Sequence, residues 1–263
     1  LSGYNVSIQD LKDFRKLKSK TPGHPEFGIT EGVETTTGPL GQGIANAVGM
    51  ALAEKILAQK INTASLKPID HMTYCFLGDG CLMEGISHEA MSLAGVLKLN
   101  KLICFYDSNG ISIDGKIDAW YQDDIALRCR SYGWHVIDNV DGHKRDDINS
   151  AIEEAKLSDK PTMIVCKTSI GYGAGNKQDS EASHGAPLGK EAMATLRKNL
   201  DWPYKPFELD KQIYDLWNAV EKGIALENEW DNLCENFAKS EPDNFDLMQR
   251  LISGEMPDNF NSD

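Results

Sequence analysis

Long apolar runs are missing from this 263-residue sequence, and no stretch approaches the ~20 apolar residues that a membrane-spanning helix needs. The first ten residues carry neither the basic start nor the apolar core of a signal peptide. Positive charge is also scarce, because 27 Lys and Arg stand against 40 Asp and Glu, a formal net charge of −13. We therefore expect no nucleic-acid partner and no membrane partner, since surfaces for nucleic acid and anionic membranes are rich in Lys and Arg.

Closely spaced cysteines are absent as well. No two of the six cysteines lie within four residues of each other, which excludes zinc-knuckle and dithiol motifs. Cys75, Cys104 and Cys166 stand inside apolar runs. This pattern predicts buried, reduced thiols, and we expect a cytoplasmic protein.

What the sequence does contain is an alternation of short apolar runs and helical patterns. Strands are expected at 73–77, 102–106, 134–137 and 162–166, and helices near 44–60, 84–98, 122–132 and 145–157. Continuous apolar runs of this length are typical of strands buried on both faces of a parallel sheet. The alternation predicts an α/β fold, with a doubly wound, mainly parallel sheet flanked by helices.

Acidic residues are concentrated at one end of the chain. Residues 201–263 carry 5 basic and 15 acidic side chains, whereas residues 1–200 carry 22 and 25. Pro203 and Pro206, which follow Trp202, interrupt any helix there, and apolar residues recur at helical spacing beyond them. We therefore expect an α/β domain over 1–200 and an acidic helical extension over 201–263, whose apolar face packs on the main body.

Two polar motifs follow the first two predicted strands, Gly78–Gly80 (GDG) and Asp107–Ile111 (DSNGI). Adjacent parallel strands bring such ends to one edge of a sheet, where ligands bind in open α/β folds. Asp79 supplies a carboxylate and Asn109 an amide oxygen, which with a backbone carbonyl form a partial shell for Mg²⁺ completed by phosphate. A helix starting near Glu84 is expected to point its N-terminus at the same place, which favours phosphate. By itself the GDG motif is more typical of a turn than of a ligand site, and the DSNG residues of the second motif are also typical of a turn.

Together these motifs resemble the diphosphate-binding signature of thiamine diphosphate enzymes, and longer stretches narrow the resemblance to the transketolase family. The stretches are Lys20–Glu26 (KTPGHPE), Glu34–Gly43 (ETTTGPLGQG), Gly78–Gly85 (GDGCLMEG) and Ser183–Gly189 (SHGAPLG). The likeness is collinear from about residue 11 to the C-terminus. It implies the diphosphate-binding domain of a transketolase, with thiamine diphosphate and Mg²⁺ or Ca²⁺ as cofactors.

The resemblance implies a metal and diphosphate site at the sheet edge. Asp79, Asn109 and the Ile111 carbonyl would hold the divalent ion, and Asn109 would also contact the cofactor. Gly80 would meet the diphosphate through its backbone.

The family pattern also implies contacts with the rings of the cofactor. Gly38 and Leu40 would contact the aminopyrimidine and thiazolium, and Ile113 and Ile170 would form apolar walls around the thiazolium.

Four polar residues receive further roles from the resemblance. His24 and His184 would hydrogen-bond the cofactor diphosphate or the sugar hydroxyls and move protons, and they are the expected catalytic residues. Glu84 and Glu89 resemble glutamates that are buried at the dimer interface of the family and link its two active sites. A homodimer is therefore expected.

The activity implied is reversible transfer of a two-carbon ketol unit from a ketose phosphate to an aldose phosphate, in the pentose phosphate pathway. Xylulose 5-phosphate and ribose 5-phosphate are the expected substrates. A transketolase chain is more than twice this length, so we expect a part of a longer enzyme or a split-gene subunit. Its opening segment and a pyrimidine-binding domain after the extension would be absent, and the part alone would be inactive.

Three alternatives stay open on the sequence. Two are related thiamine diphosphate enzymes, dihydroxyacetone synthase and deoxyxylulose-phosphate synthase. The third is a non-catalytic scaffold of the same fold. Donor choice depends on segments outside this sequence, so dihydroxyacetone synthase is the harder of the two synthases to exclude.

Overall fold

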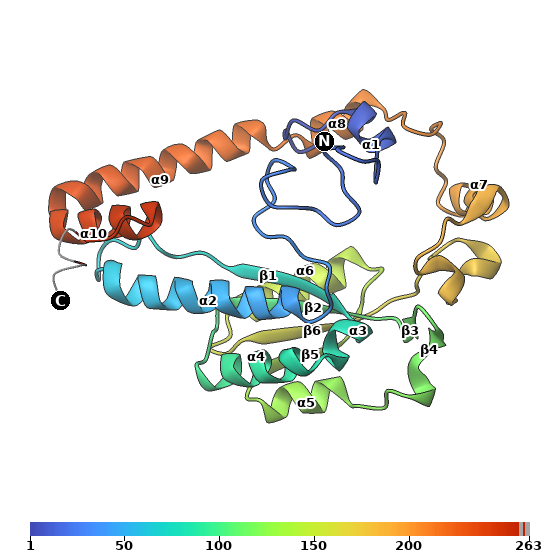
Figure 1. Ribbon diagram of the computed structural model, residues 1–263, viewed down its shortest axis with the longest axis horizontal. Helices are drawn as coiled ribbons and strands as arrows, with labels where there is room; N and C mark the ends of the chain where they lie inside the picture. The colour runs from blue at the N-terminus through green and yellow to red at the C-terminus, as the bar shows by residue number, and fades with distance from the viewer. Residues whose placement is uncertain (258–259, 261–263) are drawn as a thin grey trace. The chain divides into compact units, whose positions relative to one another are not determined.

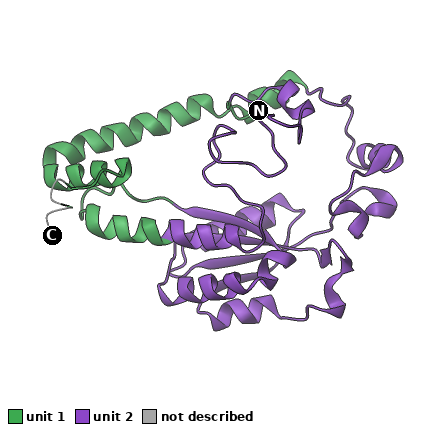
Figure 2. Cartoon of the chain, in the orientation of Figure 1, with its two compact units in different colours: residues 1–4, 52–71, 210–263 green, residues 5–51, 72–209 purple. Residues whose placement is uncertain are grey.

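The computed structural model describes residues 1–257 and 260 and divides the chain into two compact units (Figure 2). Unit 1 contains Leu1–Tyr4, Leu52–His71 and the chain from Asp210 onward, and unit 2 contains Asn5–Ala51 and Met72–Leu209. The predicted domains, 1–200 and 201–263, remain predictions, and residues 258–259 and 261–263 lie outside the described residues.

Unit 2 is built on a four-stranded parallel sheet with the strand order β1-β2-β6-β5 (Figure 1). The strands are β1 (Thr73–Gly78), β2 (Leu102–Ser108), β5 (His135–Asp141) and β6 (Thr162–Lys167). Every neighbouring pair is parallel. The predicted mainly parallel sheet is therefore confirmed, and its strands lie close to the predicted runs.

Helices cover both faces of this sheet (Figure 1). On one face α6 (Arg145–Lys156) buries Ala151 and Ala155 against side chains of the central strands. On the other face lie α4 (Gly85–Val96) and α5 (Ile125–Ser131). These helices match the predicted periodicities, which supports the doubly wound arrangement.

Burial differs between the central and the edge strands. Strands β2 and β6 show continuous burial, as predicted. Strand β1 alternates instead, with Tyr74 45% and Phe76 78% exposed, because it is an edge strand of the described sheet. The expectation that all four strands are buried on both faces is wrong for β1 and for β5, which lies at the other edge.

The remaining elements of unit 2 are short. They are α1 (Ile8–Lys12), α3 (Asp79–Met83), the hairpin of β3 (Ile111–Ser112) and β4 (Gly115–Lys116), three 3₁₀ turns (Ile117–Ala119, Gly175–Lys177, Glu181–Ser183) and α7 (Gly189–Asn199). Helix α2 (Gln42–Ile61) begins in unit 2 and continues into unit 1. Helix α3 was not predicted, and it rather than the helix near Glu84 begins at the GDG motif.

Unit 1 contains α8 (Lys211–Trp217), α9 (Val220–Ser240) and α10 (Pro242–Ser253). Its core comprises Ile61, Ile69, Cys234, Phe237 and Met248. The apolar residues that recur at helical spacing in this region differ in exposure. Phe237 is buried within the unit, whereas Leu216 is 77% exposed.

All six cysteines are free thiols, and five of them are buried, in agreement with the prediction of reduced thiols. No helix in the described part of the chain has the length and apolar character required to cross a membrane.

Candidate functional site

Asp79 lies where β1 ends and α3 begins. Its side chain is 3% exposed, and the Tyr106 hydroxyl on β2 donates a hydrogen bond to its Oδ1. Its Oδ2 is buried and has no hydrogen-bond partner among the described residues. Buried carboxylate oxygens are normally hydrogen-bonded or bound to a cation, so this oxygen indicates a ligand site.

The electrostatic surroundings of Asp79 favour a bound cation. Burial raises the pKa of Asp79 above its ordinary value, while the hydrogen bond from Tyr106 opposes the rise. Burial and the neighbouring Asp79 in turn raise the pKa of Tyr106, which keeps that hydroxyl a donor. The ionised carboxylate is therefore disfavoured without a counter-ion, and a cation at Oδ2 would stabilise it.

Asn109 occupies the turn that follows β2. Its Oδ1 accepts the Ile111 N–H at 2.9 Å, and its Nδ2 donates to Asp107 Oδ2 at 3.3 Å. Gly78 pairs with Asp107 in the β1–β2 register, so the two polar motifs lie side by side. An amide oxygen has two lone pairs, so Asn109 retains one for a cation.

A cavity of about 360 Å³ opens at these strand ends, and we name it the strand-end cavity. It brings together eight of the residues predicted from the sequence. They are Leu40, Asp79, Gly80, Asn109, Ile111, Ile113, Ile170 and His184. A Cβ built on Gly80 would lie 3.0 Å from Leu40 Cδ1, so glycine leaves its backbone open toward this space.

The oxygen donors of the strand-end cavity fit a hard divalent cation that arrives with a phosphate group. Among the described residues, no three His, Cys, Asp or Glu side chains form a metal cluster by themselves. Asp79 and Asn109 contribute one carboxylate and one amide, and a carbonyl such as that of Ile111 would add a third oxygen. Mg²⁺ is typically held by few protein oxygens and completes its shell with water and substrate phosphates.

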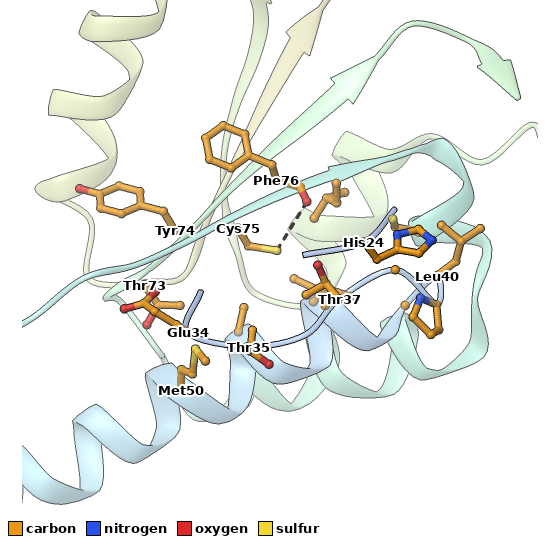
Figure 3. A pocket seen from close by; sticks show the side chains of 18 residues that line it. His24, Glu34, Thr35, Thr37, Leu40, Met50, Thr73, Tyr74, Cys75 and Phe76 are labelled. Carbon is orange, nitrogen blue, oxygen red and sulfur yellow. Dashed lines mark hydrogen bonds between the residues drawn. The ribbon is translucent and has the colours of Figure 1, made fainter. Parts of the chain in front are cut away.

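A second cavity of about 480 Å³ lies between the loop at 34–41, the start of α2 and β1, and we name it the loop cavity. Figure 3 shows His24 and Leu40 close together at one end of it. A Cβ built on Gly38 would lie 2.7 Å from the His24 ring, and the φ of Gly38 is +144°. Only glycine suits both the conformation and the close approach of the imidazole.

The structure places the two predicted catalytic histidines in different cavities. His24 lines the loop cavity and His184 the strand-end cavity, while Leu40 and Cys81 line both. Glu84 and Glu89 are exposed in this chain. The backbone of Gly41 lies close to Glu84, because a Cβ on Gly41 would be 2.7 Å from Glu84 Cβ.

Two supporting residues were missed by sequence reasoning. Tyr106 fixes Asp79, and its hydroxyl in an apolar strand was the available signal, since a buried tyrosine hydroxyl usually has a partner. His143 accepts the Ser169 N–H at 2.9 Å and stacks on Tyr172, with ring centroids 4.2 Å apart. These contacts hold the loop that carries Ile170, and nothing local in the sequence indicates them.

Comparison with known proteins identifies the family. A family model described as "Transketolase, thiamine diphosphate binding domain" matches residues 1–257. Transketolase 1 of Escherichia coli is 54% identical over 263 residues, which are 100% of this chain and 40% of that protein. The chain thus spans about 40% of the length of this curated relative.

Solved structures agree with this match. A transketolase from Leishmania mexicana superposes with a TM-score of 0.94 at 42% identity, covering 99% of this chain and 39% of that one. A Pichia stipitis transketolase in complex with sedoheptulose 7-phosphate gives a TM-score of 0.93 at 41% identity, with the same coverage. This chain belongs to the transketolase family, in which it corresponds to the thiamine diphosphate binding domain.

Proposed function

We propose that this chain forms the metal and diphosphate half of a transketolase active site. The enzyme would transfer a two-carbon ketol unit reversibly from a ketose phosphate to an aldose phosphate. The observation that carries the proposal is the strand-end cavity, where the unpartnered Oδ2 of Asp79 lies among the other predicted cofactor contacts. Transketolases of Pichia stipitis, solved with xylulose 5-phosphate, sedoheptulose 7-phosphate and fructose 6-phosphate, support sugar phosphates as substrates.

In this proposal Asp79, Asn109 and the Ile111 carbonyl hold Mg²⁺ or Ca²⁺, and the backbone of Gly80 contacts the diphosphate. Thiamine diphosphate, when bound, would supply the nucleophilic carbon for the donor carbonyl. The protein contributes binding and electrostatics, because its oxygen ligands would hold the divalent ion beside the diphosphate, whose negative charge the ion would offset.

In this proposal the other residues that line the two cavities bind and orient the cofactor and the substrate. Ile113 and Ile170 exclude water from the thiazolium, while Gly38 and Leu40 contact the cofactor rings. His24 and His184 hydrogen-bond substrate hydroxyls or the diphosphate and move protons at those hydroxyls. Their separation between two cavities supports contacts with different parts of the bound cofactor and sugar.

In this proposal a second subunit and a further domain lie next to the site. Glu84 and Glu89, exposed in this chain, would be covered by a second copy in a homodimer. The helices after residue 201 would lead toward a pyrimidine-binding domain, and the chain alone would be inactive. The enzyme would act in the cytoplasm, in the pentose phosphate pathway.

The test is a two-carbon transfer assay on the natural polypeptide that carries this sequence. Xylulose 5-phosphate, ribose 5-phosphate, thiamine diphosphate and Mg²⁺ are supplied, and sedoheptulose 7-phosphate is measured by mass spectrometry. We expect product that depends on both cofactors, and none from the 263-residue chain by itself. Cofactor binding without product would instead favour a related synthase, and no cofactor binding would favour a scaffold.

A further inference from the structure

Helix α3 carries the start of the metal site but is too short to be stable by itself. It has five residues, and Asp79 and Gly80 are its first two. Isolated helices need about 12–15 residues to be even marginally stable in water, and the last carbonyls of a helix have no partner within it. The direction of the Asp79 side chain therefore depends on groups that hold α3 from outside.

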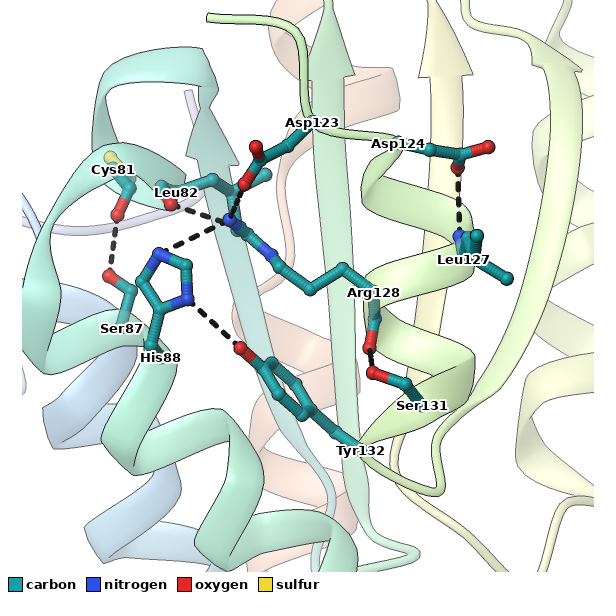
Figure 4. Close-up of polar contacts among 10 residues, drawn as sticks. All are labelled: Cys81, Leu82, Ser87, His88, Asp123, Asp124, Leu127, Arg128, Ser131 and Tyr132. Atoms are coloured by element: carbon teal, nitrogen blue, oxygen red, sulfur yellow. Dashed lines mark hydrogen bonds and ion pairs between the residues drawn. The ribbon is translucent and has the colours of Figure 1, made fainter.

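Two side chains from other helices bind the C-terminal carbonyls of α3, as Figure 4 shows. The Ser87 hydroxyl, from α4, donates to the Cys81 carbonyl. Arg128, from α5, donates from Nη2 to the Leu82 carbonyl at 2.9 Å. These two hydrogen bonds fix the end of α3 to both neighbouring helices, and Leu82 itself is fully buried.

The Arg128 guanidinium is itself held in place. Its Nη1 lies 2.9 Å from Asp123 Oδ2 and 3.2 Å from His88 Nε2, and its side chain is only 11% exposed. A guanidinium has donors only, so His88 Nε2 must be the acceptor and Nδ1 must carry the hydrogen. That hydrogen is donated to the Tyr132 hydroxyl at 2.9 Å.

We infer that Arg128 is a positioning residue for the metal site, acting through the Leu82 carbonyl on α3 and thereby on Asp79. The inference rests on the proposed function. Arg128 is not among the residues that line the strand-end cavity, so it would not contact the cofactor in the proposed function. Arginine suits this role because its planar fork reaches Leu82 with one nitrogen and Asp123 and His88 with the other, whereas a lysine ammonium is a single point charge.

Metal preference provides a readout that a merely structural role would not change. Mg²⁺ demands near-ideal octahedral geometry, whereas Ca²⁺ tolerates irregular geometry. Loosening α3 should therefore weaken Mg²⁺ binding more than Ca²⁺ binding. The effect of residues that orient metal ligands is typically about 10–100-fold in metal affinity.

The experiment compares Arg128→Lys and Arg128→Gln with wild type in the natural polypeptide that carries this sequence. Calorimetry measures Mg²⁺ and Ca²⁺ affinities at saturating thiamine diphosphate. Arg130→Gln is the matched control, because Arg130 lies on the same helix, is 48% exposed and pairs with Asp138 at 3.7 Å. We expect the ratio of Mg²⁺ to Ca²⁺ affinity to fall about tenfold in the Arg128 variants and to change less than about twofold in the control.

The outcomes separate this inference from the proposed function. An unchanged ratio in the Arg128 variants, or an equal loss for both metals, overturns the inference while the proposed function stands. If circular dichroism shows that Arg128→Gln does not fold, Arg128→Lys decides. Failure of wild type to bind thiamine diphosphate with either metal overturns the proposed function, and this inference with it.

Discussion

The two cavities share Leu40 and Cys81 but are built in different ways. In the strand-end cavity, Asp79 and Asn109 come directly from the ends of β1 and β2, which are fixed by a parallel ladder. In the loop cavity, His24 belongs to the first 41 residues, whose only regular element is the five-residue helix α1. Metal binding needs fixed oxygens, whereas recognition of hydroxyls tolerates a loop, and the proposed function assigns the metal to the strand ends and the hydroxyls to the loop accordingly.

The largest effect is expected at the strand-end cavity, from Asp79→Asn. Loss of the one carboxylate ligand should weaken Mg²⁺-dependent binding of thiamine diphosphate by about 100-fold or more, roughly 2.7 kcal/mol. Calorimetry with the natural polypeptide measures this. Unchanged Mg²⁺-dependent affinity would contradict the metal assignment.

The same substitution should stabilise the metal-free protein. Burial raises the pKa of Asp79 in the folded protein above the ordinary value of 3.8 for this side chain. The free energy of unfolding therefore falls as the pH rises above 3.8, because the unfolded chain gives up this proton more readily than the folded one. A neutral amide removes that loss, so the melting temperature of Asp79→Asn without metal should exceed that of wild type at pH 7. A lower melting temperature would show that the buried charge is already compensated.

In the loop cavity, Gly38→Ala should perturb folding rather than metal binding. The added Cβ would meet the His24 ring in a strained conformation, so we expect a loss of about 1–3 kcal/mol in the free energy of unfolding. Gly28→Ala is the control, because its φ is +81° but its Cβ would meet nothing within 4 Å. Equal losses in urea unfolding would show that strain alone, without the His24 contact, explains the effect.

Asn109→Ala should have a smaller effect than Asp79→Asn, because it removes a neutral ligand. It also removes the acceptor for the Ile111 N–H, so part of the turn loses its order. We expect about a tenfold weaker Mg²⁺-dependent cofactor affinity. An effect as large as that of Asp79→Asn would mean that Asn109 mainly shapes the turn.

The smallest effect on the cofactor is expected from His24→Ala. His24 does not line the strand-end cavity, where the diphosphate contacts lie, so of its two proposed partners we expect the sugar hydroxyls rather than the diphosphate. Cofactor affinity should then change less than about twofold. The KM for the sugar phosphate should rise by about tenfold, as for one lost hydrogen bond. A loss of cofactor affinity comparable to that in Asn109→Ala would show that the two cavities act as one metal site.

The parallel sheet was predictable because continuous apolar runs in β2 and β6 are a local signal. The proximity of Asp79 and Asn109 was predictable as well, because each follows one of two strands that were expected to be adjacent. The edge position of β1 was not predictable, because strand order depends on pairings between distant residues. The five residues of α3 are too few to show helical periodicity.

The hydrogen-bond partners of the residues that hold the site in place could not be assigned from the sequence, for a related reason. Tyr106 and Asp79 are 27 residues apart, and Arg128 and the Leu82 carbonyl are 46 apart. Such contacts exist only once strands and helices have packed. The motifs that resemble transketolase predicted what the site contains, whereas the structure shows what holds Asp79 in place.

The central claim is that the strand-end cavity binds thiamine diphosphate through a divalent ion. It is tested most directly by calorimetric titration of thiamine diphosphate into the natural polypeptide, with Mg²⁺ present and then with Mg²⁺ removed by EDTA. The account predicts binding with Mg²⁺ and its loss in EDTA. Equal affinity in the two titrations would contradict it.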